Sequence, residues 1–175
     1  AVAQVRRELG VRTVFNLLGP LTNPAQVGRQ VVGVFAPRWC QPMATALAQL
    51  GVERGDVVCG HGGIDEVAVD GDTTVATLDR GRVELRTLRP HDFGFALANP
   101  AELAGGDAVR NAAILWQVLS GREISAGQRW HTIAQAAAMT AALALATRRT
   151  EPLPVLAADA VASLHDQRAA TALWR

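Results

Sequence analysis

The chain has 175 residues, of which 49% are hydrophobic and 19% charged, a balance that is typical of a globular domain and excludes a disordered segment. A formal net charge of +1 gives no support to a nucleic-acid groove or a membrane-binding surface, and no apolar run reaches the roughly twenty residues that a membrane span needs. No signal peptide is visible, and the two cysteines, Cys40 and Cys59, fit a reducing cytosol, so a cytoplasmic location is predicted.

The first ten residues have the pattern of the last turns of a helix and end at a glycine, where a C-cap belongs. Because the chain starts at Ala1 with a helix already under way, we expect a fragment of a longer protein. Residues 12–18 form a short segment of uncertain type. Residues 19–24, which begin with Gly-Pro, predict a break in regular structure that Thr22 and Asn23 hold by side-chain hydrogen bonds to the backbone.

A strand-helix-strand unit follows. Residues 30–36 are rich in Val and predict a buried strand, residues 42–50 predict a helix, and residues 56–59 predict a second strand. The short joints between them indicate that the two strands are parallel. Residues 73–78 and 83–88 flank an Asp-Arg-Gly-Arg turn, and this spacing predicts a hairpin.

The last third of the chain is predicted to be helical. Asp107 is placed to cap one helix, residues 128–148 form a long Ala-rich helix, and a final helix follows Pro154 and reaches the C-terminus. Mixed strands flanked by helices define an α/β fold with a mixed central sheet. We assign residues 25–175 to this α/β domain and residues 1–24 to the remnant of a separate helical domain.

Two short runs carry candidate chemistry. By residue type alone, the run 12–24 is more simply a loop between structural units. The run Gly-Gly-Ile-Asp65-Glu66 places adjacent carboxylates on a loop after a strand, which suits Mg²⁺ because this ion takes few protein carboxylates and shares its coordination with phosphate oxygens. The simpler interpretation of these two acids is an exposed acidic turn. A third run, residues 103–112, is interpreted as a structural glycine turn with a helix cap.

Together these runs resemble the anthranilate phosphoribosyltransferase family, which joins anthranilate to the ribose of phosphoribosyl pyrophosphate in tryptophan synthesis. The match includes Val-Arg-Arg-Glu-Leu-Gly at residues 5–10 and Asn-Leu-Leu-Gly-Pro-Leu-Thr-Asn-Pro at residues 16–24. The resemblance covers essentially the whole chain but only the later half or so of the family's fold. It therefore implies the C-terminal domain of the nucleoside phosphorylase and class III phosphoribosyltransferase type.

The resemblance also implies roles for four residues. Arg6 and Gly19 would bind anthranilate, since a guanidinium can bond its carboxylate and stack on its ring, and a glycine lets the backbone approach that ring. Asp65 and Glu66 would hold magnesium on phosphoribosyl pyrophosphate. Without the resemblance, Arg6 would be interpreted as a solvated helix residue.

The chain departs from the family in two regions. Cys59 stands where many members have histidine, and His61 follows two residues later. We interpret Cys59 as a buried strand residue and His61 as a loop histidine without a partner. In the long helix, Gln135 replaces the family's asparagine, a change that bears on local packing and little on the substrate assignment.

The resemblance further implies that several phosphate-binding elements precede this chain. A Gly-Thr-Gly-Gly-Asp loop, an Asn-x-Ser/Thr-Thr segment and a Lys-His-Gly-Asn-Arg stretch are not found here, and the sequence contains no lysine at all. We therefore expect the isolated chain to be inactive. Family members commonly dimerise through their helical domain, so a homodimer is expected only for the full-length protein.

Two alternatives remain open from the sequence. A non-catalytic relative of the same fold that binds nucleic acid would need a basic face, whereas the chain has 17 basic and 16 acidic residues. A pyrimidine nucleoside phosphorylase shares the fold, but the run at residues 15–24 is typical of the anthranilate branch.

Overall fold

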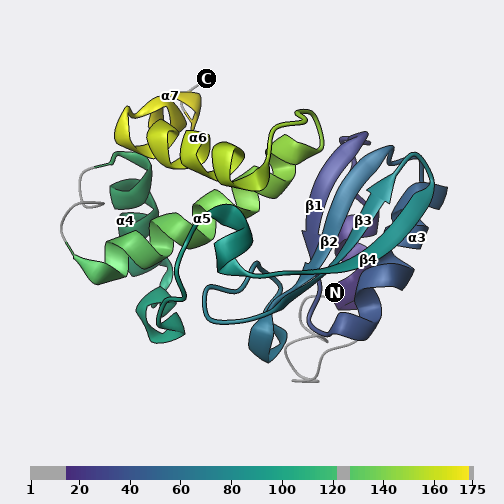
Figure 1. Cartoon of the computed structure of the whole chain (residues 1–175), viewed down its shortest axis with the longest axis horizontal. Coiled ribbons are helices and arrows are strands. Elements are labelled where there is room, and N and C mark those ends of the chain that lie inside the picture. Colours follow the sequence, from purple (N-terminus) through teal and green to yellow (C-terminus); the bar gives the residue numbers. More distant parts are fainter. Residues whose placement is uncertain (1–14, 122–126, 174–175) are drawn as a thin grey trace.

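Four strands form one mixed sheet in the order β1-β2-β3-β4 (Figure 1). The computed structural model, which describes residues 15–121 and 127–173, places β1 at Arg29–Gly33, β2 at Arg54–Cys59, β3 at Thr73–Asp79 and β4 at Arg82–Leu88. β1 and β2 are parallel, and the other two pairings are antiparallel. The mixed α/β sheet predicted from the sequence is therefore confirmed.

The predicted strand-helix-strand unit is present, with a short 3₁₀ turn η1 (Pro37–Trp39) leading into helix α3 (Cys40–Gln49) between the parallel strands. The hairpin is also confirmed. Arg80 and Gly81 at its tip have φ of 47° and 86°. Two successive positive φ angles are the pattern of a type I′ turn, whose twist matches that of the flanking strands.

Among the described residues, four helices follow the sheet: α4 (Ala108–Leu119), α5 (Gln128–Ala146), α6 (Leu153–His165) and α7 (Arg168–Leu173). The short turns η3 (Pro90–Phe93) and η4 (Pro100–Leu103) connect the sheet to them. The prediction of one final helix was wrong, because the chain breaks between α6 and α7. Gln167 there has a φ of 62°, which no α-helix continues.

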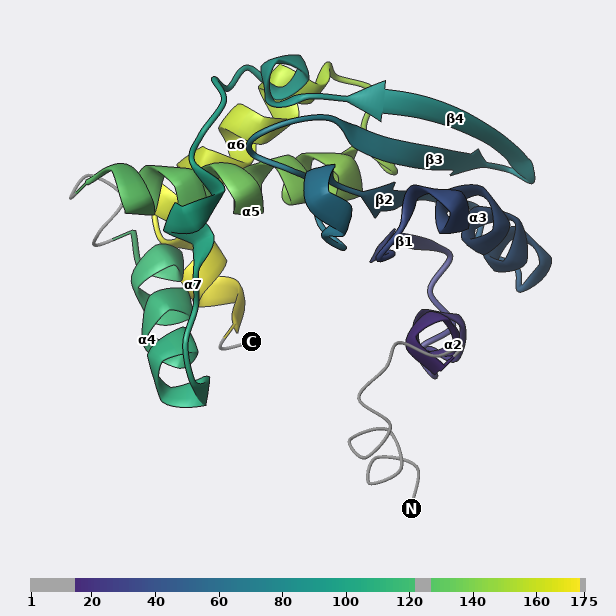
Figure 2. The same cartoon turned by 90° about the horizontal axis from the view of Figure 1, so that it is seen from below.

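Helices cover both faces of the sheet. Adjacent residues Val57 and Val58 on β2 are each 1% exposed and belong to different core clusters, since successive side chains of a strand point to opposite faces. Val57 packs in the cluster that contains Leu47 of α3, and Val58 packs in the cluster that contains Leu143 of α5 and Leu156 of α6. Figure 2 shows α4 and α7 next to each other, away from the sheet.

A short helix, α2 (Phe15–Leu21), precedes the sheet, and it corrects the prediction of a break at Gly19 and Pro20. Both residues are helical, and Pro20 is compatible with the helix because its fixed φ is itself a helical angle. The chain leaves the helix one residue after Pro20, where Thr22 donates from both its N–H (3.2 Å) and its hydroxyl (3.1 Å) to the Gly19 carbonyl. The Asn23 side chain accepts from the Ala25 N–H at 3.0 Å, as the turn chemistry predicted.

In the part of the chain that the structure describes, no helix has both the length and the apolar character needed to cross a bilayer.

Candidate functional site

The predicted acidic loop directly follows β2, whose last five residues are buried and fix its starting point. A 3₁₀ turn, η2 (His61–Gly63), opens the loop. The loop closes on itself, because the Gly60 N–H donates to the Ile64 carbonyl at 2.9 Å and the Gly63 N–H donates to the Gly60 carbonyl at 3.0 Å. Gly62 and Gly63 have φ of 72° and 79°, a region that residues with a Cβ rarely adopt.

The backbone of the two acids is held by close contact with glycines. A Cβ placed on Gly33, the last residue of β1, would lie 1.7 Å from the Asp65 carbonyl oxygen. A Cβ placed on Gly60 would lie 2.6 Å from the Glu66 carbonyl oxygen. Only glycine allows approaches this close. Gly33 and Gly60 therefore let the acidic loop pack directly against the ends of β1 and β2.

A buried segment anchors the other side of the loop. Val67, Ala68 and Val69 are at most 2% exposed. The Ala68 N–H donates to the buried hydroxyl of Thr73 at 2.9 Å, and the Val69 carbonyl accepts from the Ala98 N–H at 2.9 Å. The carboxylates of Asp65 and Glu66 therefore project into solvent from a backbone that is fixed on both sides.

Two exposed carboxylates on a fixed loop offer oxygen ligands of the kind that Mg²⁺ takes from proteins. Among residues 15–121 and 127–173, no group of three or more His, Cys, Asp or Glu side chains is arranged to hold a metal ion. An ion at Asp65 and Glu66 would thus need oxygen ligands from outside this set. Mg²⁺ commonly binds one or two carboxylates together with phosphate oxygens and water, so the donor set fits this ion when it is bound to a phosphorylated ligand.

Glu66 also lines a cavity of about 630 Å³ between α4 and α5. The rest of the lining is largely apolar, with Ile114 and Leu115 from α4 and Ile133 and Ala137 from α5. Leu115 is 56% exposed at this cavity. We call this cavity the α4–α5 groove.

The two residues assigned to anthranilate are placed differently. Arg6 lies outside the described residues. Gly19 is exposed on α2, and a Cβ placed on it would meet no atom within 4 Å, so its surface is open. The chain that follows it, from Pro20 to Asn23, lines a hollow of about 600 Å³ with the end of α3. Neither this hollow nor the α4–α5 groove includes Gly19 in its lining, so the structure does not bring Gly19 and the two acids around one described cavity.

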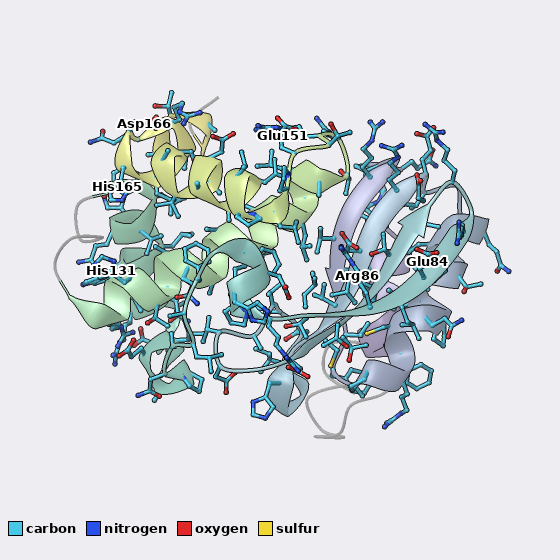
Figure 3. All side chains as sticks on the ribbon, in the orientation of Figure 1. Glu84, Arg86, His131, Glu151, His165 and Asp166 are labelled. Atoms are coloured by element: carbon cyan, nitrogen blue, oxygen red, sulfur yellow. The ribbon has the colours of Figure 1, made fainter. Side chains whose placement is uncertain are left out.

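The structure corrects the interpretation of His61. Its ring Nδ1 lies 3.0 Å from the Asp70 carboxylate, so His61 has a partner, which it finds nine residues further along the chain. Figure 3 labels two further histidines, His131 and His165, which lie in the helical part of the molecule, away from the sheet. Sequence reasoning missed both Asp70 and Gly33. A glycine inside a strand is itself a signal of close backbone approach, and could have pointed to Gly33.

Both cysteines are structural. Cys59 is 1% exposed at the end of β2, as predicted. Burial, with a further contribution from Cys59, raises the pKa of the Cys40 thiol to about 11. Because the thiolate is the reactive form, Cys40 stays protonated and unreactive at neutral pH.

The third run is structural, as its pattern indicated. The Asp107 carboxylate caps α4 by accepting from the Arg110 N–H at 2.8 Å. The Asn111 side chain closes the glycine turn, since its oxygen accepts from the Gly106 N–H at 2.8 Å and its amide donates to the Gly106 carbonyl at 3.0 Å. The side-chain amide of Gln135 donates to the Ala96 carbonyl at 2.9 Å.

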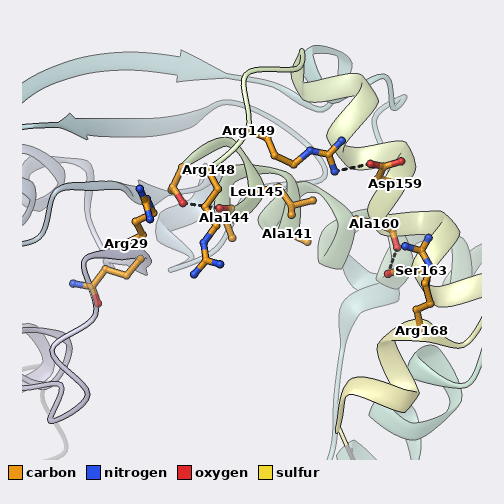
Figure 4. A pocket seen from close by; sticks show the side chains of 12 residues that line it. Arg29, Ala141, Ala144, Leu145, Arg148, Arg149, Asp159, Ala160, Ser163 and Arg168 are labelled. Carbon is orange, nitrogen blue, oxygen red and sulfur yellow. Dashed lines mark hydrogen bonds and ion pairs between the residues drawn. The ribbon is translucent and has the colours of Figure 1, made fainter. Parts of the chain in front are cut away.

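Basic side chains gather in one further hollow of about 520 Å³, shown in Figure 4, where Arg29 and Arg148 face the space between β1 and the end of α5. A nucleic-acid groove needs guanidinium groups that are free to meet phosphates. Six of the described arginines instead form ion pairs with carboxylates, namely Arg54, Arg82, Arg86, Arg89, Arg149 and Arg168. Arg149 and Arg168, which also line this hollow, are therefore partly neutralised by carboxylates.

Residues 1–167 match the family model described as the α/β domain of the glycosyl transferase family. The chain is 53% identical over 120 residues to an anthranilate phosphoribosyltransferase of Azorhizobium caulinodans, and 54% identical over 127 residues to one of Rubrobacter xylanophilus. These alignments cover 69% and 73% of this chain but only 35% and 37% of the relatives.

Solved structures show the same relationship. Anthranilate phosphoribosyltransferase from Thermus thermophilus superposes with a TM-score of 0.81 at 40% identity, over 97% of this chain and 48% of that protein. The enzyme from Saccharomyces cerevisiae, solved in complex with phosphoribosyl pyrophosphate and magnesium, superposes with a TM-score of 0.79 at 29% identity, over 98% and 48%. The chain thus spans about half the length of these solved relatives. Its sequence match and its fold agree, and the chain belongs to the glycosyl transferase family as an example of its α/β domain.

Proposed function

We propose that the complete protein transfers the phosphoribosyl group of phosphoribosyl pyrophosphate to anthranilate, giving N-(5-phosphoribosyl)anthranilate and pyrophosphate in tryptophan synthesis. The observation that carries this proposal is the pair of exposed carboxylates, Asp65 and Glu66, on a loop whose backbone is fixed by Gly33 and Gly60. Relatives solved with phosphoribosyl pyrophosphate and magnesium, and with 4-fluoroanthranilate, support both substrate classes.

In this reaction the anthranilate nitrogen forms a bond to C1 of the ribose, the bond from C1 to the pyrophosphate oxygen breaks, and the nitrogen loses a proton. Bound Mg²⁺ supplies positive charge that stabilises the departing pyrophosphate. Asp65 and Glu66 would hold that ion, and the fixed loop would orient the leaving group. Much of the rate gain in such a reaction can come from holding two substrates in the reacting geometry, and no covalent enzyme intermediate is needed.

Arg6 and Gly19 would orient the other substrate. In the complete protein we expect Arg6→Ala to raise the KM for anthranilate about tenfold or more, because a charge-assisted hydrogen bond contributes roughly 1.5–3 kcal/mol. The KM for phosphoribosyl pyrophosphate should stay within about twofold of wild type, since Arg6 does not contact that substrate in this proposal. Steady-state kinetics with each substrate varied in turn measures both values.

Arg7→Ala is the matched control, because it removes the same charge one residue away. We expect it to leave the KM for anthranilate close to wild type. Equal losses for both substrates in Arg6→Ala, or equal effects of the two substitutions, would contradict the role assigned to Arg6.

We also propose that residues 1–175 alone are inactive. The α4–α5 groove supports this, because an open apolar cavity with Leu115 and Ala137 exposed beside Glu66 is a surface that a soluble protein usually covers. The test compares pyrophosphate release by this chain and by the product of its complete reading frame, each supplied with both substrates and Mg²⁺. We expect release only from the complete protein, and turnover by the chain alone would refute the proposal.

The division into a helical remnant (1–24) and an α/β domain (25–175) stays a prediction, as does a homodimer of the complete protein. The two alternative functions have direct tests. A nucleic-acid-binding relative would bind DNA with an affinity that falls steeply with salt concentration. A pyrimidine nucleoside phosphorylase would release the base from a pyrimidine nucleoside in the presence of phosphate. We expect neither activity.

A further inference from the structure

The start of the acidic loop is almost without side chains. Between Gly60 and Gly63 the only residue that is not glycine is His61. Glycine-rich segments have a large conformational freedom that must be restrained when a loop is held in one form. Within residues 60–63, His61 is therefore the one residue whose own side chain can restrain the loop.

The side chain of His61 connects the start of the acidic loop to Asp70, at the end of the buried segment that anchors the loop. Its Nδ1–H donates to the Asp70 carboxylate at 3.0 Å, and Asp70 directly follows the buried residues 67–69. The side chain of Asp70 is 24% exposed, whereas that of His61 is 62% exposed. Asp70, which accepts the hydrogen bond, is thus the more buried member of the pair.

A close contact restricts the imidazole ring as well. A Cβ placed on Gly71 would lie 3.0 Å from both Cβ and Cγ of His61, so the ring rests against the backbone of this glycine. The ring is therefore restrained by a hydrogen bond on its edge and by backbone beside it.

We propose that His61 and Asp70 form a clamp that positions Asp65 and Glu66 for Mg²⁺ and phosphoribosyl pyrophosphate. The expected effect on Mg²⁺ and phosphoribosyl pyrophosphate rests on the proposed function, whereas the restraint of the loop by His61 and Asp70 does not. His61 acts as a positioning residue and not as a metal ligand, because its Nδ1 is bound to Asp70 and Mg²⁺ prefers oxygen ligands to imidazole nitrogen. The pair closes the segment from residue 61 to residue 70, and the two acids lie within that segment.

The expected size of the effect is modest. A hydrogen-bonded pair with one well-exposed partner contributes about fivefold or less to an equilibrium. In the complete protein, His61→Ala should raise the KM for phosphoribosyl pyrophosphate and the Mg²⁺ concentration for half-maximal rate by about threefold to fivefold. The KM for anthranilate should not change. Asp70→Ala should have the same effect, and the double substitution should be no worse than either single one, because all three remove one shared bond.

Two further variants separate positioning from a general loss of stability. His61→Asn keeps an N–H near the place of Nδ1 and should restore both values to within about twofold of wild type. His91→Ala removes a histidine from another exposed pair, with Asp92 at 3.3 Å, and should change neither value. Wild-type values in His61→Ala, or a loss in His61→Ala that His61→Asn does not restore, would overturn the proposal.

Hydrogen exchange of the protein without ligands tests the clamp apart from the activity. Amides of residues 60–66 should exchange about threefold to fivefold faster in His61→Ala, while those of the β3–β4 hairpin stay unchanged. If the wild-type protein has no phosphoribosyltransferase activity but the exchange difference is seen, the proposed function fails and the clamp stands. If the activity is present and the exchange is unchanged, the clamp is wrong and the proposed function stands.

Discussion

Replacing Gly33 by alanine is expected to reduce activity of the complete protein about 100-fold. The added Cβ would lie 1.7 Å from the Asp65 carbonyl oxygen and 2.6 Å from its carbonyl carbon. Gly33 is paired with Val58 in the parallel ladder, so the strand cannot easily move away. The Asp65 backbone must shift instead, and a displacement of about 1 Å at a site that positions a substrate can cost on the order of 100-fold in rate.

The same overlap should lower the free energy of unfolding by about 1–3 kcal/mol, the usual range for an overpacked site. Denaturant unfolding measures this change, and kinetics at a temperature well below the transition measures the activity of the folded protein. Gly28→Ala is the matched control, because a Cβ there would meet no atom within 4 Å. Wild-type activity in Gly33→Ala would show that the close approach to Asp65 has no functional consequence.

The second large effect is expected from the acids themselves. The paired substitution of Asp65→Asn and Glu66→Gln keeps the size of both side chains and removes both charges. Neutral amides are much poorer ligands for Mg²⁺ than carboxylates, so we expect a loss of activity of at least about 100-fold. The unfolding free energy should hardly change, because both side chains are exposed and the backbone contacts of the loop remain.

The parts of the fold that could be predicted from sequence are those with local signals. The Val-rich strands, the helix between them and the Arg-Gly turn of the hairpin are each determined by residues close together in the chain, and all are present. The Asp107 cap is local in the same way, because its carboxylate accepts from the N–H of Arg110, only three residues further along the chain.

The errors arose where local signals are ambiguous or absent. Gly19 and Pro20 are typical of turns, yet both fit the helical angles of α2. The break between α6 and α7 falls at Gln167, which adopts a positive φ although no glycine or proline marks the place. At that break the Asp166 carboxylate accepts from the Arg168 N–H at 3.2 Å. Helix propensity is a weak signal that tertiary context overrides, so it did not separate either outcome from its alternative.

The candidate site was only partly predictable for a related reason. Asp65 and Glu66 could be named from their run, because adjacent acids after a buried strand are visible in the sequence. The contacts that hold them could not. Gly33 meets Asp65 across 32 positions of the chain, and His61 finds Asp70 only because the buried segment between them folds back. Contacts of this kind depend on tertiary structure and have no local pattern.

Direct binding is the sharpest test of the proposed site. Calorimetric titration of the complete protein with phosphoribosyl pyrophosphate, in the presence and absence of Mg²⁺, should show strong binding only with the metal. In the protein with Asp65→Asn and Glu66→Gln, the metal-dependent part of this binding should disappear while binding of anthranilate is unchanged. Undiminished metal-dependent binding in that double variant would contradict the assignment of these two carboxylates to the magnesium-bound substrate.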